Sequence, residues 1–142
     1  MEFGSEEYLK KVKEVTNNDT KYIDMIKNEN TSYTFIIDPE PENGVEKKIV
    51  LGYTIKNGMM DQIWLGEKNT DFVISGRYGI WVDLIIGKQS VTSAFLSRKL
   101  RISGEFSKIL KLASPTEYWL KILRKIPIEF HGNYSKYNIR GE

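Results

Sequence analysis

The side chains that most often perform catalysis are scarce in this sequence. It has no cysteine and one histidine, His131, beside Gly132 near the C-terminus. A serine hydrolase needs a base near its nucleophile, and the chain has no Gly-x-Ser-x-Gly motif. A single histidine without cysteine leaves no common zinc ligand set. We therefore expect no catalytic residue, no metal and no cofactor. The least favoured function is an acyl-CoA hydrolase that depends on His131 or Asp83.

The charges of the chain are unevenly distributed. Residues 1–75 carry 9 Lys and Arg against 14 Asp and Glu, whereas residues 76–142 carry 12 against 5. A basic half can contact anionic groups, so a transient contact with an anionic membrane surface stays open beside the favoured interpretation that these charges solvate helix faces. No nucleic-acid recognition motif is present, and we expect no nucleic-acid partner.

The composition indicates a globular protein of the cytoplasm. Apolar residues make up 40% of the chain and charged residues 28%, which is the balance of a folded protein. The absence of cysteine is typical of a cytoplasmic protein, and no apolar run reaches the length of a membrane span. Residues 1–5 show no basic-then-apolar signal pattern, and we assign them no part in function.

Two helices and four strands are predicted in the first half. Ser5 and Asp19 are good N-caps for helices within residues 5–28. Asn57 and Gly58 form the preferred pair for a tight hairpin between two strands. Runs of β-branched and aromatic residues, bounded by turn residues, predict strands at 33–38, 47–56, 59–65 and 71–75.

Helical spacing dominates the second half. It predicts a helix that ends at Gly87, because glycine is the usual residue after a helix C-terminus. Ser114 followed by Pro115 is a helix-start signature, so we expect a separate last helix there. Residues 99–103 alternate apolar and basic, as on an edge strand. The helix that ends at Gly87 covers residues 80–86, and two further helices are predicted at 92–97 and 106–113.

The order of these elements predicts an α+β fold, in which a mainly antiparallel sheet carries helices packed on one face. The helical passage 75–99 is long enough to carry a crossover to a non-adjacent strand. We expect one domain over residues 1–142. Its parts are N-terminal helices at 5–28, a core at 33–113, and an extra C-terminal helix and tail at 114–142.

A distinctive pattern begins where the 80–86 helix ends. Gly-Lys is followed after a gap by Ala-Phe, and then Lys-Leu-x-Ile-x-Gly precedes an apolar helix. The matching positions are Gly87, Lys88, Ala94, Phe95, Lys99, Leu100, Ile102, Gly104 and Leu112. In this segment the chain resembles the sterol carrier protein (SCP-2-like) family. It departs at Val91, where the family often has proline, and at Arg98, where the family often has glycine, so we expect the turn into the last strand to differ.

The resemblance implies a five-stranded sheet covered by helices, with a hydrophobic tunnel between them. It also implies non-catalytic binding or transfer of an apolar ligand, namely a fatty acid, a fatty acyl-CoA, a phospholipid or a sterol-like lipid. Apolar walls are the usual form of such pockets, and the candidate contacts are bulky residues of the later helices: Trp81, Leu84, Ile85, Phe95, Phe106, Ile109, Leu110, Trp119 and Leu123. The alternative is an interaction or homodimerisation module of the same fold without a usable tunnel.

Overall fold

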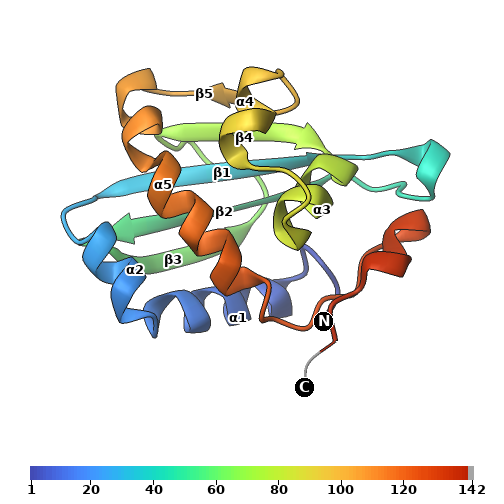
Figure 1. Cartoon of the computed structure of the whole chain (residues 1–142), viewed down its shortest axis with the longest axis horizontal. Helices are drawn as coiled ribbons and strands as arrows, with labels where there is room; N and C mark the ends of the chain where they lie inside the picture. Colours follow the sequence, from blue (N-terminus) through green and yellow to red (C-terminus); the bar gives the residue numbers. More distant parts are fainter. Residues whose placement is uncertain (141–142) are drawn as a thin grey trace.

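A five-stranded sheet forms the centre of the computed structural model, and the helices lie on one of its faces (Figure 1). The structure describes residues 1–140, so the last two residues of the predicted tail, 141–142, lie outside the described part. The elements are α1 (Glu6–Asn17), α2 (Thr20–Met25), β1 (Thr31–Asp38), η1 (Pro41–Asn43), β2 (Ile49–Lys56), β3 (Met59–Leu65), β4 (Phe72–Arg77), α3 (Tyr78–Ile86), α4 (Val91–Leu96), β5 (Arg101–Ser103), α5 (Phe106–Leu123) and η2 (Gly132–Tyr137). The predicted α+β class is confirmed.

The first half follows the sequence prediction. Ser5 and Asp19 cap α1 and α2, because each side chain accepts a hydrogen bond from the backbone N–H three residues on. Asn57 and Gly58 have φ values of 50° and 79° between β2 and β3. Both central residues of a type I′ turn need positive φ, so the Asn-Gly pair forms the predicted tight hairpin.

The strand order is β3-β2-β1-β4-β5, and β1 and β4 form its one parallel pair. Because β3 and β4 both run parallel to β1, loop 66–71 must carry the chain past two strands. The Thr34 hydroxyl of β1 ties this loop to the sheet, lying 2.8 Å from the Thr70 hydroxyl and donating to the Lys68 carbonyl at 3.2 Å. The passage 75–99 instead returns to β5, which pairs with β4 itself, so the crossover predicted there is wrong.

The turn into β5 is left-handed at Arg98. This residue has a φ of 61°, in the region that glycine favours. The backbone N–H groups of Lys99 and Leu100 both donate to the Ala94 carbonyl, at 2.9 and 3.1 Å, and hold the turn closed. Arginine at this position therefore still permits a left-handed turn. Strand β5 stands at the sheet edge, as its alternating basic residues predict.

The last helix is one element rather than two. α5 runs through Pro115, so the separate helix predicted to begin at Ser114 is wrong. Proline has no N–H and leaves the carbonyl of Lys111 without its usual helical donor. The next carbonyl, that of Leu112, accepts from the Thr116 hydroxyl at 2.7 Å. The helix continues because apolar residues on both sides of the proline pack against the same core.

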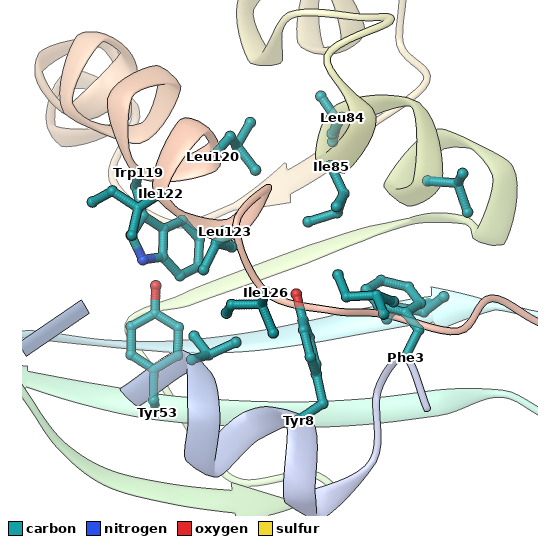
Figure 2. Packing of buried hydrophobic residues seen from close by; sticks show 14 of the residues in the cluster. Phe3, Tyr8, Tyr53, Leu84, Ile85, Trp119, Leu120, Ile122, Leu123 and Ile126 are labelled. Atoms are coloured by element: carbon teal, nitrogen blue, oxygen red, sulfur yellow. The ribbon is translucent and has the colours of Figure 1, made fainter. Parts of the chain in front are cut away.

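Residues 1–5 pack against residues 126–139, which lie near the other end of the chain. Phe3 is 4% exposed and meets Phe130 with ring centroids 5.3 Å apart, in an edge-on arrangement. The backbones of Ile128 and Ile139 exchange two hydrogen bonds of 2.8 and 2.9 Å, which hold the tail to the body. Residues 1–5, to which we assigned no function, therefore contribute to the core (Figure 2).

Among residues 1–140, every helix is too short or too polar to traverse a lipid bilayer.

Candidate functional site

Aromatic side chains cover the helix-facing side of the sheet. Tyr33 and Phe35 stand two residues apart on β1, and Tyr53 of β2 is paired with Tyr33. The Tyr53 ring centroid lies 5.2 Å from that of Tyr33 and 5.5 Å from that of Phe35. Side chains two residues apart on a strand share a face. The result is a continuous aromatic floor beneath the helices.

α5 crosses above this floor and sets one aromatic ring against it. Trp119 stands over Tyr53, with ring centroids 6.0 Å apart (Figure 2). It also stacks on Tyr22 of α2, with ring centroids 6.4 Å apart. Its indole N–H donates to the Thr16 hydroxyl at 2.9 Å, in a buried contact with α1. This bond fixes the ring, so Trp119 acts as a pillar between sheet and helices.

Three hollows lie between the floor and the helices. The α4–α5 hollow has a volume of about 140 Å³ and lies between α4, the first half of α5 and strands β4 and β5. The central hollow, about 50 Å³, lies under the middle of α5. The α1–α3 hollow, about 60 Å³, lies between α1, α3 and the end of α5.

The α4–α5 hollow is almost purely apolar and takes in four of the predicted contacts. Phe95 of α4 faces Phe106 of α5, with ring centroids 5.8 Å apart. Ile109 and Leu110 complete this wall. Phe106 and Leu110 are 56% and 59% exposed, so the hollow meets solvent along the first half of α5.

The α1–α3 hollow takes in four more predicted contacts. Trp81 and Ile85 come from α3, and Trp119 and Leu123 come from α5. Leu84 is buried in the core but lines none of the three hollows. Its position one residue before Ile85 turns it to a different side of α3, which the apolar stripe alone could not distinguish.

The hollows share walls. Tyr33 and Leu112 line both the central and the α4–α5 hollow. Phe35, Tyr53 and Trp119 line both the central and the α1–α3 hollow. The three spaces therefore form a row along the aromatic floor, separated by single layers of side chains.

Sequence reasoning missed the tyrosines of the central hollow. Burial raises the pKa of Tyr53, and its neighbours Tyr22 and Tyr33 raise it further. Burial likewise raises the pKa of Tyr33, with Glu29 and Asp71 adding to the effect. All three phenols therefore stay neutral at physiological pH. A tyrosine in an alternating strand is equally typical of a plain core, so the pattern gave no signal of a site.

A polar cluster lies at the other end of β1, around the buried Glu40. Its carboxylate accepts from the hydroxyl of Tyr134 at 2.7 Å, from Asn43 at 2.8 Å and from the backbone N–H of Gly79, and Arg77 lies 3.6 Å away. Burial alone raises the pKa of Glu40, but these donors and the arginine outweigh it and lower the pKa below its ordinary value. Both carboxylate oxygens are occupied by protein donors, which favours a structural role.

The residues of the hydrolase alternative are not joined into a catalytic pair. His131 lies 2.6 Å from Glu2 through its Nε2 atom and stacks on Tyr78. Asp83 lines an open polar depression beside Glu40. No hydrogen bond of the described residues 1–140 links His131 to a serine or to Asp83. In the same part of the chain, no three His, Asp or Glu side chains gather as a metal site would require.

Comparison with known sequences points to one family. A profile of the SCP-2 sterol transfer family matches residues 9–117, which is most of the chain. No curated protein sequence matches the chain.

Comparison with solved structures points to the same fold. A crystal structure of sterol carrier protein 2 has 20% identity and a TM-score of 0.79, and the alignment covers 88% of this chain and 99% of that one. A conserved hypothetical protein from Thermus thermophilus has 20% identity and a TM-score of 0.77, covering 87% and 89%. The sterol carrier protein domain 2 of Helicoverpa armigera has 26% identity and a TM-score of 0.55, covering 88% and 92%.

Proposed function

Because the chain belongs to the SCP-2 sterol transfer family, we propose that it binds and transfers an apolar ligand and does not catalyse a reaction. The observation that carries this proposal is the row of hollows along the aromatic floor, above all the α4–α5 hollow. The candidate ligands are a fatty acid, a fatty acyl-CoA, a phospholipid and a sterol-like lipid. The proposed setting is the cytoplasm, which rests on the absence of cysteine.

The proposed ligand contacts are the eight predicted residues that line a hollow, with Leu84 left out. A hollow of about 140 Å³ has the size of an apolar cavity that holds benzene. A long acyl chain therefore needs the neighbouring hollows to join into the tunnel that the family resemblance implies. Each CH₂ group buried in this way contributes about 0.8 kcal/mol, so a joined tunnel can support micromolar affinity after the costs of binding.

Filling the α4–α5 hollow tests the site. Ala113 lines it, so Ala113→Trp places an indole where the ligand chain would lie. We expect the affinity for a fluorescent fatty acid, dansyl-undecanoic acid, to fall at least tenfold. The matched control is Ser107→Trp, which adds the same side chain at an exposed position of α5. We expect that variant to bind as the parent does.

Three outcomes would contradict the proposal. The parent protein could fail to bind the probe and carry no lipid in native mass spectrometry. Ala113→Trp could bind as tightly as Ser107→Trp, which would exclude the α4–α5 hollow. The parent could release CoA from palmitoyl-CoA, which would favour the hydrolase alternative.

A further inference from the structure

The polar groups in the wall of the central hollow fall into two kinds. Trp119 donates its indole N–H to Thr16, and Thr116 donates its hydroxyl to the carbonyl of Leu112. The Thr31 hydroxyl lies 3.4 Å from the Asp71 carboxylate. These groups are all paired within the protein, so none of them has a hydrogen bond to offer a ligand without losing one.

Three tyrosine hydroxyls of the same wall are different. Tyr22 and Tyr53 are only 6% and 4% exposed, and Tyr33 is half-buried beside them. None of the side-chain hydrogen bonds within residues 1–140 involves the hydroxyl of Tyr22, Tyr33 or Tyr53, whereas the hydroxyls of Tyr78, Tyr118 and Tyr134 are all bonded. Within residues 1–140, the one fully enclosed side-chain nitrogen or oxygen without a partner is Trp64 Nε1, so these three hydroxyl oxygens stay accessible to a solvent or ligand atom. The wall of the central hollow therefore holds three tyrosines whose hydroxyls are free to hydrogen-bond a ligand.

The electrostatics of this hollow disfavour a negative charge. No Lys, Arg or His lines it, and its one charged lining residue is Glu29, whose partner Lys111 lies 3.9 Å away on the exposed side of α5. Asp71 lies close enough to Tyr33 to raise the pKa of its phenol further. A carboxylate placed here would meet like charge and no buried cation, which costs far more than an uncharged group that can hydrogen-bond.

We propose that the central hollow is a polar-head site, which selects an amphiphile with an uncharged hydroxyl head over the matching carboxylate. The head exchanges hydrogen bonds with Tyr22, Tyr33 and Tyr53, and the apolar tail extends past Tyr33 and Leu112 into the α4–α5 hollow. This inference rests on the proposed function and specifies the ligand class that the central hollow prefers, namely long-chain alcohols.

The test compares 1-decanol with decanoate, which share one chain length and differ in the charge of the head. At pH 8, isothermal titration calorimetry should show that the parent binds 1-decanol at least tenfold more tightly than decanoate. Tyr53→Phe should weaken 1-decanol binding about two- to tenfold, the range for one hydrogen bond of 0.5–1.5 kcal/mol. It should change decanoate binding less than twofold.

Tyr137→Phe is the matched control. The Tyr137 hydroxyl also has no hydrogen bond within residues 1–140, but this residue lies in η2 and lines none of the three hollows. The variant should leave both affinities unchanged. Both variants should melt near the parental temperature, because neither hydroxyl has a hydrogen bond within the protein to lose.

The outcomes separate the two claims. Equal binding of 1-decanol and decanoate, or equal losses of 1-decanol affinity in Tyr53→Phe and Tyr137→Phe, would overturn the polar-head site and leave the proposed function standing. Binding of neither ligand by the folded parent would overturn both. A markedly lower melting temperature for Tyr53→Phe would show that its hydroxyl is paired in solution and would also overturn the inference.

Discussion

Val91 shows how a single residue alters the wall of the site. The family often has proline here, and proline at the first position of a helix has no N–H to satisfy. In this chain the N–H of Val91 donates to the Glu117 carboxylate, which lies on α5. The substitution therefore adds a link between the two helices that flank the α4–α5 hollow.

Glu40 gives the protein a defined acid sensitivity. Its folded-state pKa is lowered, so its contribution is fully present above its ordinary pKa of 4.5 and is lost as the pH falls through the folded value. Glu40→Gln should cost about 1.5–3 kcal/mol at pH 7, the range for hydrogen bonds to a charged group. Its stability should also depend less on pH below 5. Urea denaturation at pH 7, 5, 4 and 3 measures both effects.

The control for this experiment is Glu42→Gln. Glu42 is paired with the same Arg77 but is 56% exposed, and exposed ion pairs contribute little. A loss of less than about 0.5 kcal/mol is expected. Equal losses in the free energy of unfolding in the two variants would mean that the buried donors around Glu40 do not contribute to stability.

The residues of the site were predictable only in part. Phe106, Ile109 and Leu110 were found because helical spacing marks an apolar face. Tyr22, Tyr33 and Tyr53 were not found, since an unpaired hydroxyl depends on what lies opposite it across the core. Leu84 was placed among the ligand contacts by the same helical spacing, although that spacing cannot say which apolar face meets a hollow.

At the scale of elements, α1 covers the edge of the sheet at β3. The Asn17 side chain donates to the Met60 carbonyl and accepts from the Met60 N–H, both at 2.8 Å. Lys13 donates to the next carbonyl, that of Asp61, at 2.6 Å. An edge strand with free backbone groups is a template for pairing with another chain. The side chains of Asn17 and Lys13 already bond these backbone groups of β3, which argues against a homodimer formed through β3.

Asn17→Ala tests this protection. The variant loses two hydrogen bonds, so we expect a loss of about 1–3 kcal/mol in the free energy of unfolding. It should also self-associate at lower concentration than the parent in multi-angle light scattering. Asn18→Ala is the control, because the Asn18 side chain bonds only within α1. A stable parental dimer that Asn17→Ala leaves intact would support the dimerisation alternative through another surface.

Local sequence signals predicted most elements correctly but failed at two places, Pro115 within α5 and loop 66–71. Ser5, Asp19 and Gly87 mark helix ends through bonds and dihedral angles that act within a few residues. Pro115 did not end a helix, because the packing of α5 on the sheet outweighs one lost backbone bond. The crossing at loop 66–71 was missed, since which strand lies next to β1 is decided by contacts distant in sequence.

At the scale of the whole molecule, residues 1–5 and 126–139 together close one side of the core. Phe130 lies against Phe3 and is 4% exposed. Phe130→Ala should cost about 3–5 kcal/mol, the usual range for a buried phenylalanine. Affinity for dansyl-undecanoic acid should persist at temperatures where the variant is folded, because Phe130 lines none of the three hollows.

Urea denaturation measures the stability of Phe130→Ala, with Ser135→Ala at an exposed position of η2 as the control. A loss below about 1 kcal/mol would show that the tail is dispensable for folding. Loss of binding in a folded variant would show that the tail shapes the site.

Pro115 has a consequence for how fast a ligand leaves. The helical bond that it removes lies between the half of α5 that borders the α4–α5 hollow and the half that carries Trp119 into the core. Proline weakens a helix at one point, where it bends most easily. A bend at this point would lift the first half of α5 away from the hollow, while Trp119 stayed in contact with the sheet. The residence time of a ligand would then depend on this bend, whereas its equilibrium affinity would depend on the aromatic floor and on Trp119. A carrier built in this way could release its ligand quickly and still bind it tightly.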